Sequence, residues 1–179
     1  AVGALIPPTC GVRGGDHFGM RAHPILKDRQ GRPLRRLHCG QDIPGPSGTA
    51  IRAPAYGCVG QAGYSPSKGY FVDLVHEQLG LVTRYFHMPN LSRLPKDNRK
   101  WKGTCFRPGE QFGAIGSTGL ATGPHLHWET APLIRKVPLM TGMQQDPMRF
   151  LNPRTPLNIS CPRLLSVAST QPGALGTPP

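Results

Sequence analysis

Acidic residues, aromatic residues and long apolar runs are all scarce in this chain of 179 residues. Only 9 Asp and Glu oppose 21 Lys and Arg, so the formal net charge is +12 at pH 7. Aromatic residues make up 7%, and no nucleic-acid module signature is present, which argues against a specific nucleic-acid partner. No apolar run approaches the ~20 residues of a membrane span. The charge therefore predicts a polyanionic partner, with anionic lipid and anionic cell-wall polymers as candidates.

The cysteines also lack a pattern, because none of the five forms a Cys-x-x-Cys pair, and this argues against a thiolate zinc knuckle. Their scatter is typical of one or two disulfides and an odd thiol in an oxidising compartment. The pairing stays open at this stage. Ala1–Thr9 lacks the basic start and long apolar centre of a signal peptide, so we expect a mature form or an excised domain. The cysteines are Cys10, Cys39, Cys58, Cys105 and Cys161.

Glycine and proline are abundant, at 23 and 21 residues, and this composition favours many short strands joined by turns over a helical bundle. The segment 77–80 between two apolar runs predicts a hairpin. Residues 88–108 are basic and aperiodic, which indicates a long surface loop. Residues 1–14 read as an irregular lead-in, and 154–179 as an irregular Pro/Ser/Gly-rich tail. The expected strands are His38–Ile43, Ala50–Pro54, Gly57–Gly63, Tyr70–His76, Leu81–Phe86, Gln111–Ile115 and His125–Glu129.

The most informative stretch is Gly-Pro-His-Leu-His-Trp-Glu at 123–129. On a strand, His125 and His127 share one face, while Leu126 and Trp128 point to the other, into packing. A helix would separate the two imidazoles by about 200°, and the upstream Gly-Pro disfavours a helix start. Two imidazoles on one face form half of a metal site, or one ligand with a general base beside it.

The other half of such a site is available in the segment His-Cys-Gly-Gln-Asp at 38–42. His38 and Asp42 at i and i+4 share one face of a strand, and Gly40 and the prolines that follow favour a strand over a helix. One carboxylate and two histidines would leave a fourth zinc position open to water, as in catalytic zinc sites. Cys39 would point to the opposite face, so we expect it in a disulfide or as a buried thiol. His87 ends an apolar strand before the basic loop.

Four motifs, HCGQD, GTAIRAP, TRYFHM and GSTGLATGPHLHWE, resemble in order and spacing the lysostaphin/LytM-type (LasA-like) zinc endopeptidases of bacterial cell walls. FGMRAHP upstream and DPMRFLNP downstream fit the flanks of that family, so the resemblance covers residues 15–153. It implies one mainly β domain there, a small antiparallel sheet with a metal site in a groove. It also implies a zinc ion (Zn²⁺) held by His38, Asp42 and His127, with His125 and His87 as the non-ligand catalytic pair.

The implied reaction is hydrolysis of peptide bonds in bacterial peptidoglycan by a zinc-activated water, with His125 or His87 as proton carrier. Glu129 and Asp73 are candidates for orienting a ligand imidazole. The implied location is secreted, periplasmic or cell-wall associated. Cations on the long loop would contact anionic wall polymers: Lys96, Arg99, Lys100 and Lys102. The alternative is a non-catalytic scaffold of the same fold that binds wall or activates a hydrolase. The bond cut and the oligomeric state stay open.

Overall fold

The computed structural model describes residues 2–11, 14–134 and 143–155, and statements of absence below refer to these residues alone. The chain is mainly β, as predicted, and its regular helical segments are three short 3₁₀ turns. No helix within the described ranges has the length and apolar character needed to cross a membrane. The strands are β1 Gly19–Lys27, β2 Pro33–His38, β3 Gln41–Pro44, β4 Ala50–Arg52, β5 Gly57–Ser65, β6 Gly69–His76, β7 Leu81–Met88, β8 Cys105–Phe106, β9 Gln111–Ala114 and β10 His125–Pro132. The 3₁₀ helices are η1 Glu77–Leu79, η2 Asn98–Lys100 and η3 Pro147–Phe150.

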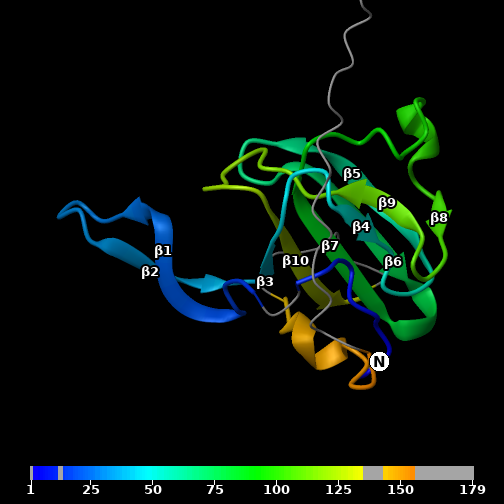
Figure 1. Ribbon diagram of the computed structural model, residues 1–179, viewed down its shortest axis with the longest axis horizontal. Helices are drawn as coiled ribbons and strands as arrows, with labels where there is room; N and C mark the ends of the chain where they lie inside the picture. The colour runs from blue at the N-terminus through cyan, green and yellow to red at the C-terminus, as the bar shows by residue number, and fades with distance from the viewer. Residues whose placement is uncertain (1, 12–13, 135–142, 156–179) are drawn as a thin grey trace, which may run out of the picture.

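A six-stranded antiparallel sheet in the order β3-β10-β7-β6-β5-β8 forms the body of the molecule (Figure 1). The pair β4–β9 adds to the core, whose buried members include Ile51, Tyr85, Phe112 and Trp128. The hairpin β1–β2 projects from this body as an arm, to the left in Figure 1. Leu5, near the N-terminus, is fully buried and pairs with Leu151 after η3.

The hairpin predicted around residues 77–80 is confirmed as β6, η1 and β7. Gly80 has a φ of 62°, a left-handed conformation that glycine adopts without a steric penalty. The strand predicted at 125–129 is likewise confirmed as the first part of β10. Leu126 and Trp128 are fully buried, and His125 and His127 lie on the opposite face. Local sequence patterns were enough to predict these two elements.

The single strand predicted at His38–Ile43 is wrong. His38 is the last residue of β2 in the arm, whereas β3 begins at Gln41 in the main sheet. The chain leaves one sheet and enters the other at Cys39 and Gly40. A Cβ on Gly40 would lie 2.4 Å from the carbonyl oxygen of Trp128. The backbone at residue 40 therefore lies too close to the backbone of β10 for any residue other than glycine. The strand β1 was not predicted.

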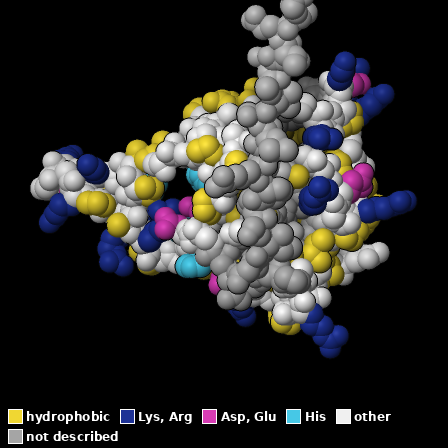
Figure 2. All heavy atoms as spheres, viewed as in Figure 1, with side chains coloured by type: hydrophobic (Ala, Val, Ile, Leu, Met, Phe, Trp, Pro, Cys, Tyr) yellow, Lys and Arg dark blue, Asp and Glu magenta, His cyan; other side chains and the backbone are white. Residues whose placement is uncertain are grey.

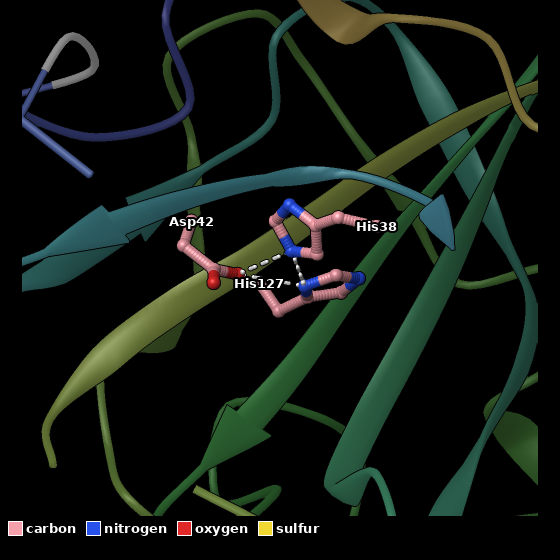
Figure 3. Close-up of side chains that lie close together, drawn as sticks. All are labelled: His38, Asp42 and His127. Carbon is pink, nitrogen blue, oxygen red and sulfur yellow. Dashed lines mark hydrogen bonds and ion pairs between the residues drawn. The ribbon is translucent and has the colours of Figure 1, made fainter. Parts of the chain in front are cut away.

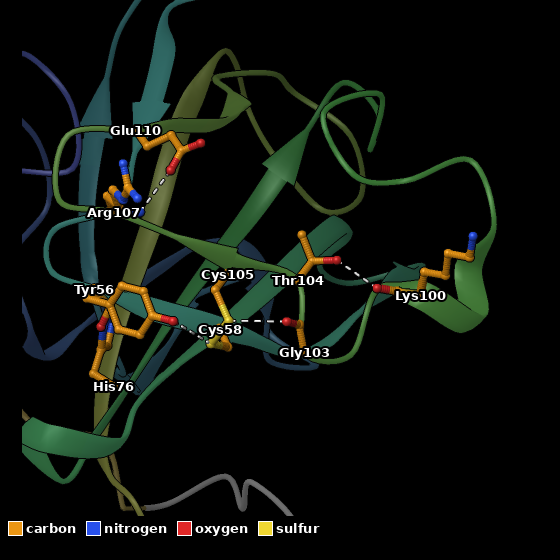
Figure 4. The surroundings of a disulfide bond; sticks show 9 residues. All are labelled: Tyr56, Cys58, His76, Lys100, Gly103, Thr104, Cys105, Arg107 and Glu110. Atoms are coloured by element: carbon orange, nitrogen blue, oxygen red, sulfur yellow. Dashed lines mark hydrogen bonds between the residues drawn. A yellow bond between two sulfur atoms is a disulfide. The ribbon is translucent and has the colours of Figure 1, made fainter.

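A disulfide joins Cys58 of β5 to Cys105 of β8 across 47 residues (Figure 4). It closes the segment predicted as a basic surface loop at 88–108, which is more ordered than expected. That segment contains η2 and β8, and its Leu94 is buried in the core. Cys10 is also disulfide-bonded, whereas Cys39 is a free, half-buried thiol and not the disulfide or fully buried thiol expected. Cys161 and most of the predicted tail at 154–179 lie outside the described residues.

Candidate metal centre

The predicted ligands His38, Asp42 and His127 lie together, with three ligand atoms facing one another (Figure 3). Asp42 Oδ1 is 2.7 Å from His127 Nδ1 and 3.1 Å from His38 Nε2, and the two imidazole nitrogens are 3.1 Å apart. The strand pairing explains the contact, because His127 of β10 stands directly opposite Asp42 of β3. His38 joins them from the end of the arm.

The other ring nitrogen of each ligand histidine is already engaged. His38 Nδ1 donates to the carbonyl oxygen of His17 at 2.8 Å, and His127 Nε2 donates to Glu129 Oε1 at 3.2 Å. With those nitrogens carrying hydrogen, His38 Nε2 and His127 Nδ1 present lone pairs toward the Asp42 carboxylate. Three electron-pair donors that converge in this way fit a cation, and two imidazoles with one carboxylate form a set that zinc accepts.

Electrostatics at this cluster agree with a cation site. Burial alone would lower the pKa of His127, but its contacts with the Asp42 and Glu129 carboxylates outweigh burial and raise the pKa to about 9. Burial would raise the pKa of Asp42, yet the neighbouring His127 and His38 lower it far below its usual value. Without a metal the cluster therefore retains a proton, and a divalent cation would replace that proton.

Two partners outside the cluster orient the ligands. Glu129 fixes His127, as the sequence suggested, and Arg21 of the arm places Nη2 3.3 Å from Asp42 Oδ2. Arg21 thus occupies one carboxylate oxygen while the other faces the two histidines. Asp73, the second candidate for this role, does not contact a ligand imidazole but pairs with Arg84.

Arg84 was missed by sequence reasoning and is the centre of a buried ion-pair network. Its Nη1 lies 3.0 Å from Glu129 Oε2 and its Nε lies 3.3 Å from Asp73 Oδ2, and all three side chains are buried. Arg84 stands opposite Asp73 in β6 and opposite Glu129 in β10. The signal was present, because Asp73 and Arg84 are opposite charges within the two apolar strands of a predicted hairpin.

The two predicted non-ligand histidines lie beside the metal cluster, with ring centroids 4.7 Å apart. His125 Nδ1 donates to the Gly123 carbonyl at 2.8 Å, and its Nε2 is 3.8 Å from Asp42 Oδ1. His87 Nδ1 donates to the Thr118 carbonyl at 2.8 Å. Burial lowers the pKa of His87 to about 4, and the Thr118 contact opposes that shift only in part. His87 is therefore neutral at pH 7, with its Nε2 lone pair unused by these contacts.

A backbone irregularity places His87 in the site. The β6–β7 register shifts between Tyr70 and Val72, so β7 carries a bulge next to His87. His87 has a φ of 65°, the only positive φ of a non-glycine residue in the described part of the chain. Its N–H donates to the Lys68 carbonyl at 2.8 Å. Active sites often hold a catalytic residue in a strained backbone conformation that hydrogen bonds maintain.

These side chains line a groove of about 650 Å³ between the arm and the main sheet. Figure 2 shows the hollow beside the arm, with histidine and acidic side chains at its edge. Ile25 and Leu37 of the arm supply apolar lining, and Leu120 lies in the segment before β10.

Comparisons with known proteins agree with this geometry. The sequence model of peptidase family M23 matches residues 36–146. The DD-carboxypeptidase/endopeptidase Mpg of Neisseria meningitidis is 37% identical over 127 residues, which are 71% of this chain and 26% of that protein. The chain thus spans about a quarter of the length of this curated relative.

Solved structures show the same fold. The catalytic domain of lysostaphin from Staphylococcus simulans superimposes with a TM-score of 0.56 at 29% identity, over 76% of this chain and 89% of that chain. A zinc-containing peptidase from Vibrio cholerae superimposes with a TM-score of 0.57 at 25% identity, over 82% of this chain and 40% of that one.

Proposed function

The chain belongs to peptidase family M23, and on that premise we propose that it is a zinc-dependent endopeptidase that hydrolyses peptide bonds in bacterial peptidoglycan. One observation carries the proposal: the ligand atoms of His38, Asp42 and His127 converge beside the imidazoles of His125 and His87, which stand outside this set of three. A purely structural zinc site would be closed by a fourth protein ligand. A relative from Vibrio cholerae, the peptidoglycan DD-endopeptidase ShyC, is 35% identical over 127 residues, and its name supports the choice of substrate.

A bound zinc ion would supply Lewis acidity, lowering the pKa of a ligated water toward ~7 and polarising the scissile carbonyl. His38, Asp42 and His127 would hold the ion. His125, whose Nε2 is directed toward the cluster, is placed to accept a proton from the attacking water and pass it to the departing amine. His87, neutral and with its Nδ1 hydrogen donated to Thr118, would share the base role, because its Nε2 lone pair can accept a hydrogen bond from the attacking water.

The direct test combines zinc content with wall-lytic activity on each purified preparation. Wild type is expected to hold one zinc per chain and to lyse peptidoglycan. His125→Ala should keep the zinc and lose the lysis, whereas His127→Ala should lose both. His17→Ala is the matched control: its backbone carbonyl still contacts His38 and its side chain is exposed, so it should keep both.

The outcomes separate the candidate functions. Zinc in the wild type without lysis of any wall type would favour the scaffold alternative. Lysis retained by His125→Ala would remove His125 from the mechanism. No zinc in the wild type, together with no lysis, would mean that the cluster binds no metal.

We also propose that the protein acts outside the cytoplasm, because the Cys58–Cys105 disulfide needs an oxidising compartment and peptidoglycan lies there. The cations Lys96, Lys100 and Lys102 are exposed on the 88–108 segment, whereas Arg99 pairs with Asp97. These cations would attract anionic wall polymers. The attraction should weaken as salt shortens the Debye length, which co-sedimentation with isolated walls would measure. The domain limits 15–153 stay a prediction.

A further inference from the structure

Four Lys and Arg side chains line the groove, and they differ in how their charge is compensated. Arg21 pairs with Asp16 and Asp42. Arg84 is buried against Asp73 and Glu129. Arg36 is exposed on the arm, where water solvates it. Lys68 is the fourth, and it is half-buried without a carboxylate at ion-pair distance among the described residues.

The position of Lys68 is well defined. It lies in the turn between β5 and β6, where its N–H donates to Ser65 Oγ and its carbonyl accepts from His87 N. Its Nζ lies 4.8 Å from the ring centre of Phe71 and 5.3 Å from that of Phe86, so two aromatic faces hold the ammonium. These contacts hold the Lys68 side chain at the groove, so its ammonium does not extend freely into solvent.

The two carboxylates that act on Lys68 from nearby, Asp73 and Glu129, are both engaged by Arg84. Burial, and then the charge of Arg84, lower the pKa of Lys68, and the charges of Asp73 and Glu129 oppose this only in part. A cation withdrawn from water and left without a counter-charge carries a desolvation cost that an anionic ligand would offset.

The ammonium is also close to the site of reaction. Phe86, which Lys68 contacts, stacks on the imidazole of His127 with centroids 5.2 Å apart and planes at 16°. The Lys68 ammonium lies 5.3 Å from the Phe86 ring centre, which lies 5.2 Å from the His127 ring centre. The ammonium is therefore no farther from His127 than the length of about three residues of extended peptide. An anion at Lys68 would therefore belong to the same peptide that lies across the metal cluster.

We propose that Lys68 binds a free carboxylate of the substrate peptide within about three residues of the scissile bond, and so determines specificity for acidic peptide crosslinks over uncharged bridges. This inference rests on the proposed peptidase function and adds a substrate class to it. D-alanyl–diaminopimelyl crosslinks carry such carboxylates, whereas oligoglycine bridges do not. Lys68 is a binding residue in this account and takes no part in bond cleavage.

The test uses two synthetic crosslinked peptides of equal length. Both contain the D-alanyl–diaminopimelyl bond, one with its carboxyl groups free and the other with them converted to carboxamides. For wild type, we expect kcat/KM and binding affinity to favour the free acid by about tenfold, the size of one charge-assisted contact. Lys68→Met should bring both ratios close to one, and Lys68→Arg should keep a preference for the acid. Lys27→Met, at an exposed lysine outside the groove, should retain the wild-type ratios.

Using ratios makes the result independent of any general loss of folded protein. Ratios near one in the wild type, or a wild-type ratio retained by Lys68→Met, would overturn the inference. A fall in kcat per folded active site for Lys68→Met that is equal on both peptides would also overturn it, because Lys68 would then act at the reacting atoms. If the wild type cleaves neither peptide, the proposed function fails. The ratio of binding affinities, measured by calorimetry, still decides the role of Lys68.

Discussion

Every residue of β7 is buried, whereas along β1 and β2 His38 alone is buried. The six-stranded sheet is stabilised by packing on its core face and by the Arg84 network on its groove face. The arm instead exposes Met20, Ile25 and Leu37. A two-stranded hairpin has little stability of its own in water. The position of the arm therefore depends on its contacts at the metal cluster. The sheet is held by its own core packing and does not depend on the cluster.

The two regions contribute to one site in different ways. The sheet supplies His127, His125 and His87 on strands whose positions are set by packing. The arm supplies His38 and the Arg21 contact to Asp42. Metal binding should accordingly order the arm, because the free energy of binding stabilises the conformation that brings the ligands together. The predictions below test that asymmetry.

The largest effect is expected for His38→Ala, which removes a ligand and the buried end of the arm together. Activity and zinc affinity should fall by more than the ~10–100-fold typical for loss of an outer partner. Hydrogen exchange should accelerate in β1 and β2 but not in β6 and β7. Metal analysis and exchange mass spectrometry would measure this. Protection lost equally in all four strands would contradict the comparison.

Next in size is Arg84→Met, which acts on the sheet. It leaves the buried carboxylates of Asp73 and Glu129 without their cation, and breaking such a pair costs about 3–5 kcal/mol. Urea unfolding of metal-free protein would measure the loss. The double variant Arg84→Met/Asp73→Asn should recover part of it, since one unpaired charge is removed. A loss below about 1 kcal/mol would mean that water reaches these carboxylates.

A smaller effect is expected for Arg21→Met in the arm. Asp42 Oδ2 loses its partner, and zinc affinity should fall by about 10–100-fold, with the carboxylate less well oriented. The unfolding free energy of the metal-free protein should hardly change, because Arg21 is partly exposed. Competition with a chelator gives the affinity. Unchanged affinity would show that the arm positions its ligands through His38 alone.

The smallest effect is expected for Leu37→Ala, at a position of the arm that lines the groove and is 46% exposed. Its unfolding free energy should stay within about 0.5 kcal/mol of wild type. The matched change Leu126→Ala, at a fully buried position of β10, should cost about 2–5 kcal/mol. Equal costs at the two positions would show that the arm packs more tightly than its exposure implies.

Sequence reasoning succeeded where one local rule decides the outcome. The period of two around His125 and His127 and the turn at Gly80 are such rules, and both were confirmed. The convergence of His38 and Asp42 was also expected, but from a single strand that does not exist. The contact is real because Gly40 lets the chain turn against Trp128. The roles of the five candidate residues stay predictions until they are measured.

The features that were missed depend on contacts between distant segments. The strand β1 has no buried face, so no apolar alternation marks it. The bulge that turns His87 into the site follows from its contacts with Lys68 and Thr118, which are remote in sequence. Arg84 acquires its role only when β6 and β10 lie on either side of β7. Single-strand patterns contain no information on such pairings.

The two edges of the six-stranded sheet have a consequence for self-association. Its strands β6 and β7 are paired on both sides, and the edge strands β3 and β8 have four and two residues, with β8 covering only Gly57 and Cys58 of β5. Gln145 bridges to Thr130 on the part of β10 beyond β3. An edge this short, ending at Pro44 on one side and cross-linked at Cys105 on the other, is a poor template for a strand of a second molecule. At high concentration, the apolar strands β6 and β7, which have partners on both sides, are thereby protected from edge-to-edge aggregation.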